Sequence, residues 1–112
     1  MLRFFTHALL ITATLSGEER IRITESEAYR IAVARARPVY PPIAKQMRIA
    51  GKVQVELLIA PNGTVENVAI LNGNALLTPA AVTAAKKWRF PPQGSGDKAA
   101  RTVCTLTYNF QL

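Results

Sequence analysis

The last twelve residues of the chain, RTVCTLTYNFQL at 101–112, constrain its fold more than any other stretch. A two-residue period places successive side chains on opposite faces of a β-strand. One set is apolar and consists of Cys104, Leu106, Tyr108, Phe110 and Leu112. The other set is mostly polar and consists of Val103, Thr105, Thr107, Asn109 and Gln111. The pattern predicts a long strand of an antiparallel sheet that is packed on one side only.

Two earlier segments predict the other strands of this sheet. Residues 52–60, KVQVELLIA, alternate over most of their length, and residues 64–73, TVENVAILNG, carry a second apolar run. The sequence PNG at 61–63 lies between them and is typical of a turn, because its glycine can adopt a positive φ. A break in the alternation of the second segment predicts a bulge near Asn67. Together the two segments are expected to form a hairpin.

Two helices are expected before the hairpin. Residues 24–36, TESEAYRIAVARA, carry Thr24 and Glu27 at the spacing of a capping box, which indicates a helix start. A second, short helix is expected to have Pro42 at its first position, where the missing N–H costs nothing. Its apolar side is expected to consist of Ile43, Met47 and Ile49.

A third helix is expected at 79–88, PAAVTAAKKW, with Thr78 as its N-cap and Pro91-Pro92 after its end. Trp88 is expected to anchor this helix to the sheet, and Phe90 to close the turn beyond it. The three predicted strands and their helices indicate an α+β fold. We expect a two-layer domain in which helices cover one face of a three-stranded antiparallel sheet.

The beginning of the chain has the layout of a signal peptide. Arg3 supplies a positive charge, a mostly apolar stretch follows, and small residues precede Gly17. Residues 1–17 are therefore predicted to be a cleaved export signal, with a short anchor or a folded part of the domain as alternatives. An N-terminal helical extension is then expected at 18–37, and the main domain at 38–112.

The composition argues against catalysis and against metal binding. The chain has one cysteine, Cys104, and one histidine, His7, so a zinc site of the usual Cys/His type is not available. Its acidic residues form no recognisable acid–base pair, and it has no phosphate-binding glycine loop. We expect no enzyme activity and no cofactor. Cys104 is expected to be a buried, inert thiol, with a reactive thiol as the alternative.

The formal net charge of +7 favours solubility and a weak attraction to anionic surfaces. The cations are scattered along the sequence, and no series of stacking aromatic residues runs among them. Nucleic acid is therefore not the expected partner.

The segment YPPIAKQMRIAGKVQVELLIAPNGTVENVAILNGNALLTPAAVTAAKKWRFPP at 40–92 resembles the C-terminal domain of TonB proteins. The marks of this resemblance are Tyr40-Pro41, Gly51-x-Val53, Asn62-Gly63-x-Val65, the helix end KKWRFPP and the closing strand to Leu112. The resemblance covers 38–112. It implies a small α+β domain with a three-stranded antiparallel sheet in the periplasm of Gram-negative bacteria.

In this family the domain binds the TonB box, a short segment at the N-terminus of outer-membrane transporters, which adds as a strand beside the final strand. Energy from the inner-membrane proton-motive force then opens the transporter through ExbB and ExbD. The resemblance implies that the partner-binding residues here are Val103, Thr105, Thr107, Asn109 and Gln111, with Arg37, Pro38, Val39, Tyr40 and Pro41 as a second contact zone. Arg37 and Val39 stand where the best-studied members carry Gln.

Full transducers of this family have an N-terminal membrane helix and a proline-rich spacer, whereas the seven prolines here all lie between 38 and 92. We therefore expect a stand-alone, exported TonB-like domain that binds an extended peptide or a partner strand by β-augmentation. The expected partner is a protein or peptide, such as the N-terminal segment of an outer-membrane TonB-dependent receptor. A homodimer that pairs final strands between copies, an anionic-surface binder and an inner-membrane-associated location remain alternatives.

Overall fold

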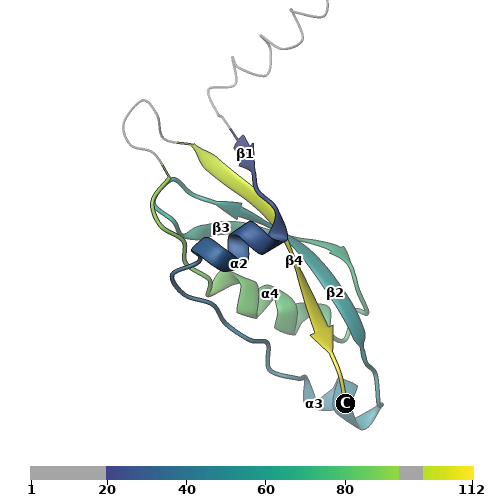
Figure 1. Cartoon of the computed structure of the whole chain (residues 1–112). Helices are drawn as coiled ribbons and strands as arrows, with labels where there is room; N and C mark the ends of the chain where they lie inside the picture. The colour runs from purple at the N-terminus through teal and green to yellow at the C-terminus, as the bar shows by residue number, and fades with distance from the viewer. Residues whose placement is uncertain (1–19, 94–99) are drawn as a thin grey trace, which may run out of the picture.

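The computed structural model describes residues 20–93 and 100–112, so the segment predicted as a signal peptide lies outside the described residues. A four-stranded sheet in the order β1-β4-β2-β3 packs against helices (Figure 1). The strands are β1 (Arg20–Arg22), β2 (Gly51–Ile59), β3 (Val65–Asn72) and β4 (Arg101–Phe110). The helices are α2 (Glu25–Ile31), α3 (Pro42–Gln46) and α4 (Thr78–Lys86). The α+β class predicted from the sequence is confirmed.

The central strand β2 pairs antiparallel with both β3 and β4. Its ladder with β4 runs over nine residue pairs without a register shift. In the hairpin with β3, Leu58 faces Asn67 whereas Ile59 faces Val65, which is the bulge predicted near Asn67. Gly63 in the hairpin turn has a φ of 96°, as the turn chemistry predicts.

The sheet has one strand more than the three predicted. Residues Arg20, Ile21 and Arg22 of β1 pair in parallel with Arg101, Thr102 and Val103 of β4. All three side chains of β1 are exposed, so the segment lacks the buried alternation by which a strand is recognised in a sequence. The sheet is therefore antiparallel in β2, β3 and β4, and parallel at its β1 edge.

Helix α2 begins as predicted and ends earlier. The Thr24 side chain accepts a hydrogen bond from the Glu27 N–H at 3.1 Å, which confirms the predicted cap. The helix ends at Ile31 rather than at residue 36. Beyond its end, the Val33 N–H donates to the Arg89 carbonyl at 2.8 Å. A tertiary hydrogen bond thus overrides the helix propensity of the alanine-rich residues that follow.

Two predicted details of the other helices are wrong. In α3, Ile43 and Met47 are 54% and 62% exposed, and the buried residue is Ala44. The five-residue helix thus rests on the domain through its small residue. In α4, Thr78 lies inside the helix, and fully buried Leu77 takes the N-cap position. Thr78 therefore does not cap the helix, and its N–H and that of Leu77 donate to the Asn74 carbonyl at 3.0 and 2.9 Å.

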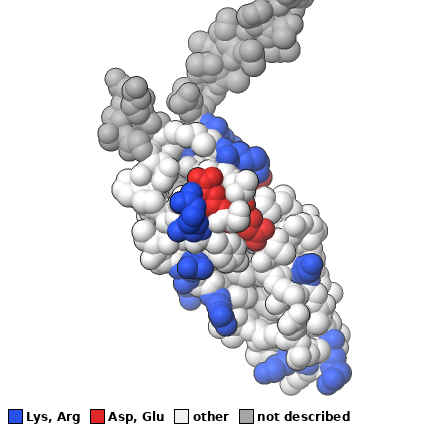
Figure 2. All heavy atoms as spheres, in the orientation of Figure 1, with Lys and Arg blue, Asp and Glu red and all other residues white. Residues whose placement is uncertain are grey.

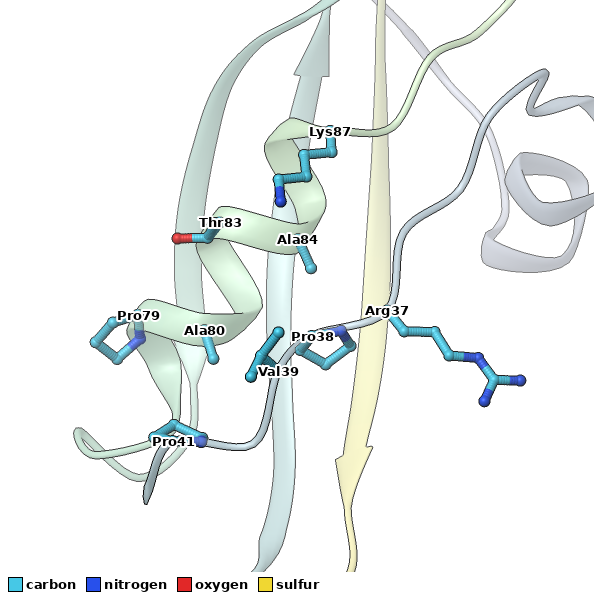
Figure 3. A pocket seen from close by; sticks show the side chains of 9 residues that line it. All are labelled: Arg37, Pro38, Val39, Pro41, Pro79, Ala80, Thr83, Ala84 and Lys87. Atoms are coloured by element: carbon cyan, nitrogen blue, oxygen red, sulfur yellow. The ribbon is translucent and has the colours of Figure 1, made fainter. Parts of the chain in front are cut away.

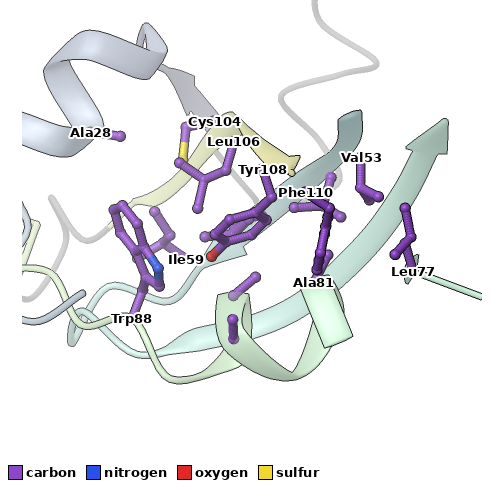
Figure 4. Close-up of a cluster of buried hydrophobic side chains, with 14 of the residues drawn as sticks. Ala28, Val53, Ile59, Leu77, Ala81, Trp88, Cys104, Leu106, Tyr108 and Phe110 are labelled. Carbon is purple, nitrogen blue, oxygen red and sulfur yellow. The ribbon is translucent and has the colours of Figure 1, made fainter. Parts of the chain in front are cut away.

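The hydrophobic core lies between the sheet and the helices (Figure 4). Inward side chains of β2 and β4 meet buried alanines of α2 and α4, and Trp88 joins them from the segment after α4. The core includes Ala28, Val53, Val55, Leu57, Ile59, Leu77, Ala81, Ala85, Trp88, Cys104, Leu106, Tyr108 and Phe110. Leu112 is 60% exposed, so the apolar face predicted for the last strand ends at Phe110.

Candidate partner-binding site

Strand β4 turns one side of its backbone to β2 and the other side to the outer edge of the sheet. In an antiparallel ladder, alternate residues direct both their N–H and C=O groups to the same side. The Val103 carbonyl faces outward, because it accepts the Ile23 N–H at 3.0 Å. The Thr107 N–H also faces outward, because it donates to the Glu25 carboxylate at 2.7 Å. By the same alternation, the backbone groups of Asn109 point to the outer edge.

The first part of this outer edge is covered by the N-terminal segment. β1 pairs with β4 at Arg101–Val103, and Glu25 of α2 binds Thr107. Beyond Thr107, no strand among residues 20–93 and 100–112 pairs with the outer edge. Figure 1 shows β4 continuing past α2 toward α3. The last third of β4 therefore has the character of an open edge strand.

The extended segment 37–41 is fixed close to this end of β4. The ring of Tyr40 packs edge-to-face on Phe110, with 5.5 Å between ring centres and 87° between planes. The Tyr40 hydroxyl donates a hydrogen bond to the carbonyl of Ile49. Two chain segments that lie some seventy residues apart in the sequence are thus brought together by one aromatic contact.

A groove of about 410 Å³, called the edge groove below, lies between segment 37–41 and β4. It is lined by Tyr29, Arg37, Pro38, Tyr40, Thr107, Tyr108, Asn109, Phe110 and Gln111. The structure therefore brings together six predicted partner-binding residues: Arg37, Pro38, Tyr40, Thr107, Asn109 and Gln111. Each of the two predicted contact zones contributes one wall of the edge groove.

The other four predicted residues lie elsewhere. Val39 and Pro41 line a different groove of about 310 Å³ beside α4. In Figure 3 they lie on the side of the segment that faces Ala80 and Ala84, while Arg37 points away from α4. Val103 and Thr105 belong to the part of β4 near β1, and Val103 is only 7% exposed.

Sequence reasoning did not identify two residues at this edge, Glu25 and Tyr29. The Glu25 carboxylate binds both the N–H and the hydroxyl of Thr107, at 2.7 and 3.2 Å, across 82 residues of sequence. Tyr29 lines the edge groove and packs edge-to-face on Trp88, with ring centres 5.1 Å apart. Burial raises the pKa of Tyr29 above its ordinary value. No local sequence pattern predicts either contact, because both contacts depend on how α2 packs against β4.

The described carboxylates lie outside the lining of the edge groove. Three of them form ion pairs, namely Arg22–Glu56, Arg30–Glu27 and Arg101–Glu66. The hydrogen bond from Arg101 lowers the pKa of Glu66. On the face in Figure 2, acidic atoms gather around α2, and basic side chains spread along the rest. Among the residues that the structure describes, Arg37 is the one charged member of the groove lining, which favours a neutral or acidic segment as its occupant.

The described part of the chain holds no group of three or more His, Cys, Asp or Glu residues that could bind a metal ion. Cys104 is fully buried, and burial raises its pKa to about 11. A nucleophilic cysteine needs thiolate character and access, and Cys104 has neither at neutral pH. Within the same residues, no helix has both the length and the apolar character needed to cross a membrane.

The burial of Cys104 predicts a loss of stability at high pH. Its pKa rises from 9.0 to about 11 on folding, so between these values the unfolded chain loses a proton that the folded chain keeps. We expect the free energy of unfolding to fall by up to about 2 kcal/mol across this range. Urea unfolding at pH 8 and pH 10.5 measures the change. Cys104→Ala should show a smaller decrease, and equal decreases in both proteins would contradict the prediction.

Comparisons with known proteins agree with this geometry. Residues 36–112 match the family of the Gram-negative bacterial TonB protein C-terminal. The chain is 31% identical to protein TonB of Escherichia coli K12 over 93 residues, which is 80% of this chain and 39% of the relative. It is 30% identical to protein TonB of Klebsiella pneumoniae over 83 residues, which is 72% of this chain and 32% of the relative. The chain thus spans roughly a third to two fifths of the relatives' length.

The fold is similar to the solution NMR structure of the Pseudomonas aeruginosa TonB C-terminal domain. The two share 28% sequence identity and superpose with a TM-score of 0.60. The superposition covers 72% of this chain and 84% of the solved one. Since the matched family spans most of the chain, from residue 36 to the last residue, this protein belongs to the TonB C-terminal family.

Proposed function

We propose that this chain is a periplasmic protein-interaction module that binds an extended segment of an envelope protein by β-augmentation. The observation that carries the proposal is the outer edge of β4 around Asn109, which faces segment 37–41 across the edge groove. An open edge strand offers backbone N–H and C=O groups to an incoming strand. Membership of the TonB C-terminal family supports the N-terminal segment of an outer-membrane TonB-dependent receptor as the partner.

The lining of the edge groove supports a peptide as the ligand. An added strand turns alternate side chains to opposite faces, so every second side chain would enter the groove. The half-buried rings of Tyr29 and Tyr40 offer apolar surface there, and exposed Arg37 offers a positive charge. Backbone pairing would supply most of the affinity, and these three side chains would select among segments.

Titration of the ¹⁵N-labelled protein with synthetic peptides from receptor N-termini tests the proposal. We expect saturable shifts at Arg37, Asn109 and Gln111, and weaker binding by the same peptides with a central residue replaced by proline. Proline removes one backbone donor from the added strand, so the comparison separates strand pairing from simple apolar contact. Binding of no receptor peptide, or equal binding of the proline variants, would rule out β-augmentation at β4.

The periplasmic location is part of the same proposal and rests on the predicted export signal at 1–17. N-terminal sequencing of the native protein from a periplasmic extract is expected to show a start near residue 18. An uncut N-terminus in the membrane fraction would instead support association with the inner membrane.

A further inference from the structure

We propose that β1 occupies part of the strand-addition site in the free protein, held there by Glu25, and that a partner strand displaces it. This inference rests on the proposed function and concerns how access to that same site is regulated. β1 is already a strand added to the outer edge of β4, paired from Arg20 opposite Arg101 to Arg22 opposite Val103. An incoming strand that uses this part of the edge has to take the place of β1.

The hydrogen bonds at the edge show how β1 is held. After the three paired residues, the Ile23 N–H still donates to the Val103 carbonyl at 3.0 Å. Two residues later, the Glu25 carboxylate accepts hydrogen bonds from the Thr107 N–H at 2.7 Å and from the Thr107 hydroxyl at 3.2 Å. Hydrogen bonds to a charged acceptor are stronger than neutral ones. Glu25 therefore acts as a latch that closes the edge at Thr107, where the edge groove begins.

The strand beyond this latch is weakly attached. All three residues of β1 are exposed, so its removal uncovers little apolar surface. Arg22 of β1 pairs with Glu56 at 2.8 Å at the surface, with the Arg22 side chain 63% exposed. Exposed pairs of this kind contribute little to stability. The backbone pairs with β4 are therefore a main part of the attachment of β1, and a competing strand can replace them.

The rest of the N-terminal segment is anchored firmly, so release is confined to its first residues. Ala28 of α2 is fully buried in the core. Tyr29 packs on Trp88, and the Val33 N–H donates to the Arg89 carbonyl at 2.8 Å. The firm part begins at Thr24, the N-cap of α2, and release of β1 also moves Ile23, whose side chain is partly buried against the core. We infer that β1 peels away at this point while most of α2 stays in place.

Because β1 occupies the site, the apparent affinity for a partner equals the affinity of the open form multiplied by the fraction of molecules in which the edge is open. Glu25→Ala removes the latch, and Glu27→Ala is its matched control on the same turn, where Glu27 instead pairs with Arg30 at 3.5 Å. In the absence of peptide, we expect amide exchange at Ile23 to be about tenfold faster in Glu25→Ala and unchanged in Glu27→Ala. Ile23 is the informative amide, because its acceptor is Val103 and not Glu25.

A second experiment measures the affinity of each variant for the receptor N-terminal peptide that binds the wild type most tightly in the titration described under the proposed function. We expect Glu25→Ala to bind it about three- to tenfold more tightly than the wild type, and Glu27→Ala to bind it equally. Arg22→Ala should shift the affinity in the same direction as Glu25→Ala. In the wild-type complex, the Ile23 amide should lose its protection, because β1 has left β4.

The outcomes separate this inference from the proposed function. If the peptide binds while Ile23 stays protected, or if Glu25→Ala binds no more tightly, β1 is not displaced and the inference is wrong. The proposed function would survive that result, with the partner confined to the edge groove. If no receptor peptide binds the wild type or Glu25→Ala, the proposed function and the inference both fail.

Discussion

Replacing Trp88 with alanine should lower the free energy of unfolding by about 3–5 kcal/mol, the usual cost of removing a large buried aromatic side chain. Trp88 is 1% exposed and joins three parts of the domain. Its ring packs edge-to-face on Tyr29 at 5.1 Å and stacks on Phe90 at 5.9 Å. Its indole N–H donates to the Ala36 carbonyl at 3.2 Å. The substitution therefore loosens α2 and the segment before Arg37, as well as leaving a cavity.

Urea unfolding followed by circular dichroism measures this loss. A domain of this size is typically stable by about 5–15 kcal/mol, so the variant should unfold at a much lower urea concentration. Lys87→Ala is the matched control, since Lys87 is exposed and adjacent in sequence. We expect that control to stay within about 0.5 kcal/mol of the wild type. A loss below about 1 kcal/mol for Trp88→Ala would show that Trp88 does not hold these parts together.

Replacing Asn109 with proline should weaken the binding of a receptor peptide at least about tenfold, because it removes an outward N–H from the centre of the proposed pairing edge. Asn109 stands opposite Lys52 in the β2–β4 register. Its N–H points away from β2, so proline should leave that ladder intact. Proline is tolerated in edge strands when the missing N–H would have faced outward.

Asn109→Ala is the control for this variant, because it removes the side chain and keeps the N–H. We expect it to bind the same peptide within about twofold of the wild type if backbone pairing supplies the affinity. Fluorescence anisotropy with a labelled peptide measures both affinities, and urea unfolding checks that both variants are folded. Equal binding by Asn109→Pro and the wild type would place the peptide away from the outer edge of β4.

Much of the fold could be predicted from local patterns in the sequence. Cys104, Leu106, Tyr108 and Phe110 alternate with mostly polar residues, which predicts that they form the inward face of β4, and all four are buried. The turn at Gly63 and the bulge near Asn67 also follow from nearby residues. These features are local because a two-residue period and a positive φ are properties of short segments.

The features that the sequence did not predict depend on contacts between distant segments. β1 has no buried face, so its three residues show no alternation of apolar and polar side chains from which pairing with β4 could be predicted. The end of α2 at Ile31 follows from the hydrogen bond between Val33 and Arg89, 56 positions away in the sequence. At the site, alternation predicts that Asn109 faces outward. It does not predict that Glu25 reaches Thr107, since that contact needs the packed position of α2.

Strand addition at β4 can be tested by amide hydrogen exchange, measured with and without a bound receptor peptide. We expect the outward amide of Asn109 to become strongly protected in the complex. The inward amides of Tyr108 and Phe110, which face β2 in both states, should change little. A peptide that binds without protecting Asn109, and shifts only residues of the groove beside α4, would contradict strand addition at β4.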